Sequence, residues 1–277
     1  MILVIDIGAT KTLIATMDEN LDQPQIAEHR HFATPKTPRE FLNEFERQYS
    51  TMKKEGVKIA VFGIPALVKD GGIIGYFPNL PEWKNETGVA FNPAKELAAT
   101  VLDGMSVYVL NDADLGAYGE AAGLNFPETL LYIAPGTGVG VGVVTHGLIS
   151  VHSEAGRMMV EAGGKLVEWE KIASGTAIQR DYGKIANDIK DEATWRMIAA
   201  RIALGLGALI PAFNPDFVVF GGGVSTNFDK FGSFLPELLA KRMSPLVDIP
   251  PILKAREPSW AVVYGGFYYA KFLAGKE

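Results

Sequence analysis

Apolar residues along the chain fall into short runs bounded by small and polar residues, and the spacing within each run separates strands from helices. The segment Met1–Ile7 is largely apolar and β-branched, which predicts a buried strand, and Thr12–Met17 predicts a returning strand after a turn at 8–11. We expect further strands at 58–64, 106–110, 129–134, 139–145 and 217–220. The segment 66–93 is rich in Gly, Pro and Asn, so we expect irregular surface that could line a site.

Apolar residues that recur at steps of three and four predict the helices. Over the segment 38–55 these residues are Phe41, Leu42, Phe45, Tyr49 and Met52. Other helices are expected at 92–102, 113–122, 194–213 and 262–273.

Two features of the pattern bear on location. The window 197–213 has nearly the length of a membrane span, but Arg201, two glycines and Pro211 interrupt it, so we expect a core helix. The first residues, MILVIDIG, contain no basic region and no small-residue cleavage site, unlike a signal peptide. We therefore expect a cytoplasmic protein without a membrane partner.

One internal similarity bears on the architecture. The segment 2–17, ILVIDIGATKTLIATM, aligns with 130–145, LLYIAPGTGVGVGVVT, and Gly8 matches Gly136. Each segment is an apolar strand, a small turn and a second apolar strand. We interpret this as a duplicated module in two domains, each with a glycine-containing hairpin tip directed into a shared cleft, where small-molecule sites often lie. The expected domains are residues 1–111 with 262–277, and residues 112–261.

Composition narrows the function further. The chain has 277 residues, of which 48% are hydrophobic and 21% charged, as in ordinary globular proteins. It contains no cysteine, which excludes disulfides, cysteine zinc sites and thiol nucleophiles. The net charge of −6 argues against a nucleic-acid partner, which usually needs a basic face. Thirty glycines are an excess over the average share, so their positions matter.

The first glycine turn stands between the two N-terminal strands and reads Asp6-Ile-Gly8-Ala-Thr10-Lys11. A glycine turn lets backbone N–H groups approach a phosphate, while Thr10 adds a hydroxyl donor and Lys11 a positive charge. Asp6, at the strand end, could hold Mg²⁺ directly or through water. The alternative is a plain hairpin turn that Asp6 caps.

Two further glycine groups follow predicted strands. Gly136-Thr137-Gly138 is followed by Gly140 and Gly142, which leaves one strand face bare for a ligand or for a neighbouring backbone. Gly221, Gly222 and Gly223 follow the strand at 217–220, where they could accommodate a ribose or a flat ring, or form a flexible turn.

An acidic group stands at a predicted strand–helix junction, Asn111-Asp112-Ala113-Asp114. Asp112 is the candidate general base that takes a proton from an alcohol, and its alternative role is that of an ordinary helix N-cap. We assign Asp114 to the helix dipole. Together with the three glycine groups, this acid suits nucleotide binding and activation of a hydroxyl.

With these residues in place, the chain resembles the ROK sugar kinases of the actin–hexokinase superfamily over nearly its whole length. The motifs that carry the resemblance are DIGATK (6–11), GIPALVKDG (63–71), NLPEW (79–83), NDAD (111–114), APGTGVGVGVV (134–144), SEAGRM (153–158), EKIASGTAI (170–178) and NPDFVVFGGGV (214–224). The family also includes repressors with an N-terminal helix-turn-helix. Because the first strand begins at residue 2, we expect no such module here and favour the kinase branch.

The resemblance implies an α/β fold of two RNase H-like domains with ATP and Mg²⁺ in the cleft between them. It gives the smaller N-terminal domain the sugar and phosphate contacts and the larger C-terminal domain the nucleotide. The residues implied near the phosphates are Asp6, Gly8, Thr10, Lys11, Gly136, Thr137 and Gly138, and those beside the adenosine are Gly221, Gly222 and Gly223. Asp112 would deprotonate the 6-hydroxyl of an aldohexose. The other sugar hydroxyls would be held by Asn79, Asn111, Asp112, Glu154 and Glu170.

The sequence departs from the family pattern in two places. Many members carry a CxCGxxGCxE zinc motif, where this chain reads VEAGGKLVEWE (160–170), so we expect no zinc site and a closer likeness to zinc-free glucokinases. The family pattern ExGH reads Glu154-Ala-Gly156-Arg157, and the usual histidine contacts the sugar near its anomeric end. Arg157 either faces solvent or alters which sugar binds. Glu168 is an alternative to Glu170, but the spacing to Ser174-Gly175 favours Glu170.

The first hypothesis is therefore an ATP-dependent hexose kinase that converts glucose to glucose 6-phosphate. The alternatives are a kinase for fructose, N-acetylmannosamine or another hexose, a polyphosphate-dependent glucokinase, and a non-catalytic sugar or nucleotide sensor on the same fold. A homodimer is expected from the family.

Overall fold

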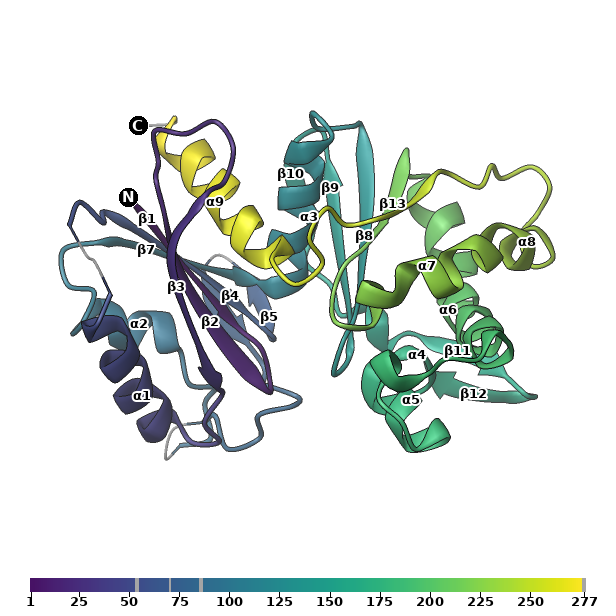
Figure 1. Cartoon of the computed structure of the whole chain (residues 1–277), viewed down its shortest axis with the longest axis horizontal. Coiled ribbons are helices and arrows are strands. Elements are labelled where there is room, and N and C mark those ends of the chain that lie inside the picture. The colour runs from purple at the N-terminus through teal and green to yellow at the C-terminus, as the bar shows by residue number, and fades with distance from the viewer. Residues whose placement is uncertain (53–54, 70, 85–86, 276–277) are drawn as a thin grey trace. The chain divides into compact units, whose positions relative to one another are not determined.

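The computed structural model describes residues 1–52, 55–69, 71–84 and 87–275 (Figure 1). It divides into two compact units, residues 1–119 with 262–277, and residues 120–261. The first boundary lies inside α3 (Asp112–Gly123), after the sequence-expected position at 111. Each unit is built on one five-stranded sheet.

The first sheet has the order β3-β2-β1-β4-β7. Its central strand is β1 (Ile2–Ile7), which pairs antiparallel with β2 (Lys11–Met17) and parallel with β4 (Ile59–Ile64). Beyond these lie β7 (Ser106–Asn111), parallel to β4, and the edge strand β3 (Ile26–Ala33), antiparallel to β2. The sequence predicted four of these strands but not β3, where buried or partly buried residues alternate with exposed ones and half of the side chains are polar.

Helices cover both faces of this sheet. On one face, α1 (Pro38–Ser50) buries Phe41, Phe45 and Tyr49, and α2 (Pro93–Ala98) packs beside β7. On the other face, Gly63 of β4 leaves room for side chains of α3 and of α9 (Ala261–Ala274). Figure 1 shows α1 and α2 on one side of the sheet and α9 on the other.

Two predicted helices are shorter in the structure than in the sequence analysis. Helix α1 ends at Ser50 with Thr51 as its C-cap, although the apolar spacing that predicted a helix to residue 55 continues to the buried Met52; residues 53–54 lie outside the described part of the chain. Ala99 caps α2, and turns take over up to residue 102. Within 66–93, β5 (Leu67–Lys69) and β6 (Gly72–Ile74) form a small hairpin, and the other described residues before α2 are mostly turns and irregular backbone, as expected.

The second sheet repeats the plan of the first in the order β10-β9-β8-β13-β14. Its members are β8 (Thr129–Pro135), β9 (Val139–Thr145), β10 (Leu148–Val151), β13 (Phe217–Phe220) and β14 (Ile252–Lys254). Strands β8, β9 and β10 are antiparallel neighbours, while β13 and β14 run parallel to β8. The two aligned sequence segments therefore fall on corresponding hairpins, β1–β2 and β8–β9.

Between β10 and β13 the second unit carries a set of additional elements. They are η1 (Ala155–Arg157), β11 (Met159–Ala162), β12 (Lys165–Glu168), α4 (Glu170–Ala173), α5 (Gly175–Tyr182), η2 (Ala186–Asp188) and α6 (Glu192–Phe213). After β13 follow η3 (Val224–Asn227), α7 (Phe228–Phe231), η4 (Gly232–Phe234) and α8 (Leu235–Ala240).

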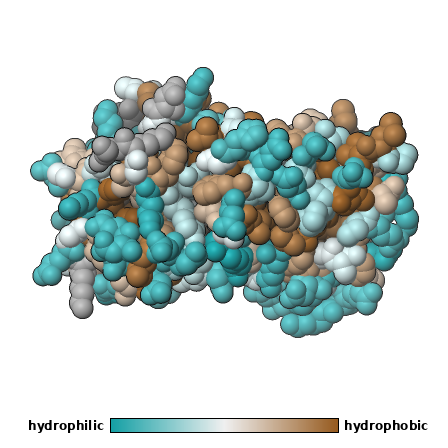
Figure 2. All heavy atoms as spheres, turned by 90° about the horizontal axis from the view of Figure 1, so that it is seen from above, coloured by the Kyte–Doolittle hydropathy of each residue, from teal (hydrophilic) through white to brown (hydrophobic). Residues whose placement is uncertain are grey.

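Helix α6 is the core helix that the sequence analysis expected. Among the described residues it is the one helix with the length and composition of a membrane span. It buries Trp195, Ile198, Ile202 and Leu206 against the second sheet, so the core of this unit accounts for its apolar character. On the face of the molecule seen in Figure 2, hydrophilic residues surround and separate the hydrophobic ones.

Candidate active site

The turn between β1 and β2 is held by backbone and threonine hydrogen bonds. The Gly8 N–H donates to the Lys11 carbonyl (2.9 Å), and a Cβ on Gly8 would stand 2.9 Å from that same oxygen. The Thr34 hydroxyl donates to the Gly8 carbonyl (2.6 Å) and lies 2.9 Å from the hydroxyl of buried Thr12. These contacts fix the backbone of the turn while Thr10 and Lys11 stay exposed.

Asp6 lies just before this turn, within β1. Burial raises the pKa of its carboxyl to about 7, and the charge of Lys11 opposes that shift. A cation brought to the turn would favour the ionised carboxylate. Asp6 is therefore suited to hold a cation that arrives with a phosphate group.

The carboxyl ends of β1, β4 and β7 meet at one edge of the first sheet, because these three strands are parallel neighbours. Asp6 pairs with Gly63, and Ile64 pairs with Asn111, which directly precedes Asp112. Two strand spacings separate β1 from β7, roughly 10 Å. The first unit therefore places Asp6, the glycine turn and Asp112 along one edge.

At this edge the helix cap is Asn111, which corrects the alternative that Asp112 caps α3. The Asn111 Oδ1 accepts hydrogen bonds from the backbone N–H groups of Ala113 (2.9 Å) and Asp114 (3.2 Å), and its Nδ2 donates to the Ala66 carbonyl (3.1 Å). Asp112 occupies the first turn of α3, where its Oδ1 accepts from the Ala113 N–H (2.8 Å). The fold thus uses most of the hydrogen-bonding capacity of Asn111 to position Asp112.

Asn79 belongs to the same unit and stands at an exposed turn between two buried anchors. The Leu80 N–H donates to the Phe77 carbonyl (3.2 Å), and both of these side chains are buried. The Asn79 side chain is exposed.

In the second unit, the turn between β8 and β9 is held by the start of α5. The Gly175 N–H donates to the Gly136 carbonyl (2.7 Å), and the Thr176 hydroxyl donates to the Thr137 carbonyl (2.8 Å). The space around the Gly136 Cα is open. The turn thus combines an open backbone at Gly136 with the start of a helix, where the helix dipole favours an anion.

The three glycines after β13 adjoin this turn and differ in their surroundings. The Tyr132 side chain occupies the place of a Cβ on Gly221, so packing explains that glycine. Gly222 has a φ of +75°, and a Cβ there would crowd the Pro135 carbonyl. Gly223 is exposed, and the space around its Cα is open. Of the three, Gly223 fits best the expectation of a bare backbone that faces a ligand.

A cluster of one arginine and three glutamates lies beside the same turn. Arg157 contacts Glu154 (Nε to Oε2, 3.7 Å), Glu168 (Nη1 to Oε2, 3.9 Å) and Glu170 (Nη2 to Oε1, 3.3 Å). Glu170 also accepts a hydrogen bond from the Val139 N–H (3.2 Å). The structure therefore brings Glu154, Arg157 and Glu170 together, with Glu168 as a fourth member.

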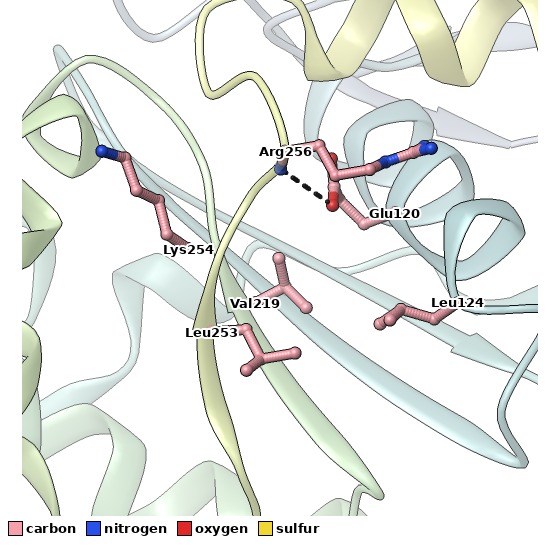
Figure 3. A pocket seen from close by; sticks show the side chains of 6 residues that line it. All are labelled: Glu120, Leu124, Val219, Leu253, Lys254 and Arg256. Atoms are coloured by element: carbon pink, nitrogen blue, oxygen red, sulfur yellow. Dashed lines mark hydrogen bonds between the residues drawn. The ribbon is translucent and has the colours of Figure 1, made fainter.

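No group of three or more His, Asp or Glu side chains among the described residues is arranged to hold a metal ion. A pocket of about 210 Å³ is lined by Val219, Leu253 and Glu120 among others. Figure 3 shows these side chains and the hydrogen bond that Glu120 accepts from the Arg256 N–H (3.3 Å). The Lys254 side chain points away from Glu120, and no predicted site residue lines this pocket.

The residues that brace the β1–β2 and β8–β9 turns were not predicted from the sequence. Thr34 directly follows the unpredicted strand β3, and Thr176 lies at the start of α5. Thr176 lies within the EKIASGTAI motif, where a serine N-cap before glycine signals a helix start, so that signal could have indicated it. No local signal marks Thr34.

Comparisons with known proteins place the chain among sugar kinases. The ROK family model matches residues 2–272. A fructokinase from Lactococcus lactis subsp. cremoris is 24% identical over 296 residues, covering 99% of this chain and 98% of the relative. A glucokinase from Thermotoga maritima is 29% identical over 200 residues, covering 57% of this chain and 61% of the relative.

A solved structure supports the fold. The ROK family glucokinase from Streptomyces griseus, in complex with glucose and AMPPNP, superposes with a TM-score of 0.77 at 21% identity. The match covers 96% of this chain and 98% of that one. The α/β architecture of two sheet-based units is therefore that of a known two-domain kinase fold.

Proposed function

This chain belongs to the ROK family, and from that premise we propose that it is a sugar kinase that transfers the terminal phosphoryl group of ATP to a hexose hydroxyl. The observation that carries the proposal is the edge of the first sheet. There, a braced glycine turn follows β1 and the acid Asp112 follows β7, and these two parallel strands are separated by β4. That spacing leaves room for a phosphoryl group and an attacking hydroxyl between them.

In the proposed reaction the carboxylate of Asp112 takes the proton of the sugar hydroxyl. The hydroxyl oxygen forms a bond to the γ-phosphorus, and the bond from that phosphorus to the bridging oxygen breaks, which releases ADP. Asn111 fixes the start of α3, so the carboxylate is oriented before the sugar arrives. Positioning and charge stabilisation dominate such transfers, because the protein has little covalent chemistry to perform.

The residues present fit a magnesium ion that arrives with the nucleotide. Mg²⁺ bound to phosphates keeps several waters and needs one or two protein carboxylates rather than a complete cage. Asp6 is the carboxylate we assign to it, and its raised pKa reflects a burial that a cation would offset. When bound, the ion would neutralise charge on the phosphate oxygens.

The second unit supplies the remaining proposed contacts. Gly136, Thr137 and Gly138, together with the start of α5, would hold phosphates, as would Gly8, Thr10 and Lys11 of the first unit. The adenosine would be bordered by Gly221, Gly222 and Gly223, and of these Gly223 has open space around its Cα. Glu154 and Glu170 would accept hydrogen bonds from sugar hydroxyls, and Asn79 of the first unit would add another.

Glucose is the sugar we propose first, with phosphorylation at the 6-hydroxyl. Both a fructokinase and a glucokinase are relatives of this chain, so fructose is the first alternative. N-acetylmannosamine and a polyphosphate donor follow. A homodimer stays an expectation from the family, and a cytoplasmic location stays a prediction of the sequence.

The test is a coupled assay of ADP release across glucose, fructose, mannose and N-acetylmannosamine, with ATP or polyphosphate as donor. We expect turnover that depends on the sugar.

The variant Asp112→Asn tests the general base. It should lower kcat by about 10³-fold while sugar binding persists. Asparagine keeps an Oδ1 that can accept from the Ala113 N–H, so the helix start is preserved. Asp18→Asn, in an exposed turn of the same unit, is the control. Sugar binding without turnover in the unaltered protein would instead indicate a sensor.

A further inference from the structure

Arg157 contacts three glutamates that come from three different elements. Glu154 directly precedes η1, Glu168 ends β12 and Glu170 begins α4. Each of the three guanidinium nitrogens faces a different carboxylate, at 3.3–3.9 Å. The side chain is 30% exposed, so this network is partly shielded from water.

Both ends of the cluster are anchored at Val139, the residue after the second glycine turn. A Cβ on Gly156 would overlap the Val139 carbonyl oxygen, which means that η1 packs directly on this backbone. The Val139 N–H donates to Glu170 on the same peptide segment. The positions of Glu154 and Glu170 are therefore tied to the turn through one residue of β9.

Arg157 is the cation that contacts both Glu154 and Glu170 among the described residues. Lys171 also contacts Glu168 (3.1 Å), but it is 64% exposed and no contact joins it to Glu154 or Glu170 within the part of the chain that the structure describes. Burial raises the pKa of the Glu154 carboxyl, Arg157 opposes that shift, and Glu170 adds to it. Arg157 is thus the cation that offsets repulsion between Glu154 and Glu170.

We propose that Arg157 is a positioning residue for sugar binding: its guanidinium holds Glu154 and Glu170 together as ionised acceptors for adjacent hydroxyls of a neutral sugar. The inference rests on the proposed function, since it assigns a sugar to these two carboxylates. It also argues against the expectation that Arg157 simply faces solvent, because the guanidinium contacts three carboxylates of the cluster. Two ionised carboxylates held at fixed spacing give directional, charge-assisted hydrogen bonds to a polyol.

The experiment compares Arg157→Met, Arg157→Lys and the control Lys171→Met, which removes the same charge from the outer side of Glu168. Sugar Kd is measured by titration calorimetry with glucose and fructose, beside KM for sugar, KM for ATP and kcat. We expect Arg157→Met to weaken sugar binding about tenfold while kcat at saturating sugar changes little. Arg157→Lys should fall between, and Lys171→Met should resemble the unaltered protein.

A second readout, the Tm of the sugar-free protein, tests the repulsion among the three carboxylates and can be compared with the sugar affinity. Glu168→Gln removes one of the three carboxylates, so in the Arg157→Met background it should raise Tm and recover part of the sugar affinity. In the unaltered background the same change should lower Tm or leave it unchanged, because it removes a partner of Arg157 and Lys171.

The outcomes separate the two claims. An unaltered protein that phosphorylates no sugar overturns the proposed function, while the Tm cycle still reports on the cluster. Unchanged sugar Kd in Arg157→Met, or an equal loss in Lys171→Met, overturns the positioning role. A Glu168→Gln effect on Tm that is the same in both backgrounds would do so as well.

Discussion

The two hairpins β1–β2 and β8–β9 share a backbone plan but carry different chemistry. In the alignment of 2–17 with 130–145, Asp6 corresponds to Ala134 and Lys11 corresponds to Val139. The first turn therefore has an acidic residue, Asp6, and a positively charged residue, Lys11, of its own. The second carries neither, and its polar contacts come from other elements: Glu170 to the Val139 N–H and Thr176 to the Thr137 carbonyl.

The difference arises from the segment that joins the third strand of each sheet to the fourth, counted in chain order. In the first unit α1 joins β3 to β4, whereas in the second a longer stretch from η1 to α6 joins β10 to β13. That stretch supplies Arg157, Glu170 and Thr176. A repeated hairpin thus fixes where the backbone turns, and the elements inserted beside it determine the chemistry at the turn.

The largest expected contrast is between the two matched glycines. Gly8→Ala should destabilise the protein by about 1–3 kcal/mol, because the new Cβ would meet the Lys11 carbonyl at 2.9 Å. Gly136→Ala should leave stability nearly unchanged, since the space there is open, but should raise KM for ATP if phosphates approach this backbone. Urea unfolding and steady-state kinetics of both variants check this.

Gly223→Ala serves as a second open-space control for the same comparison. Equal stability losses for Gly8→Ala and Gly136→Ala would show that both turns need glycine for the fold. An unchanged KM for ATP in Gly136→Ala would remove the second turn from the proposed phosphate site.

The next contrast is the acid itself, which the first turn has and the second lacks. The folded chain binds the Asp6 proton more tightly than an unfolded chain does, because the pKa rises from 3.8 to about 7. The stability linked to this proton is present below pH 4 and is lost as pH rises towards 7. Without nucleotide, the Tm of Asp6→Asn should therefore exceed that of the unaltered protein by a difference that grows from pH 5 to pH 8.

Asp18→Asn is the matched control with the opposite sign. The backbone N–H of Asn20 holds the pKa of Asp18 below its ordinary value, so ionised Asp18 contributes stability above pH 4. Its amide variant should lose a small amount of Tm at both pH values. A Tm difference for Asp6→Asn that is the same at pH 5 and pH 8 would contradict the burial of the Asp6 charge.

Local patterns in the sequence were sufficient for the two hairpins and for the strand-end acids. Asp6 and Asp112 could be predicted because each position follows from an apolar run that ends beside it. Strand β3 was missed because His29, Arg30 and His31 make it polar, and its stability comes from pairing with β2. The contacts of Arg157 with Glu168 need the β11–β12 hairpin to fold back, which no residue spacing reveals.

The smallest expected contrast lies in the two threonines that brace the turns from outside. Thr34 is 5% exposed, and its hydroxyl bonds both the Gly8 carbonyl and buried Thr12, whereas Thr176 is exposed. Thr34→Val should cost about 2 kcal/mol, since it strands buried polar groups, and Thr176→Val about 0.5–1 kcal/mol, since water can replace its hydroxyl. Urea unfolding of the two variants gives the comparison. If Thr176→Val were the more damaging, the second turn would depend on α5 for its stability and not merely for its chemistry.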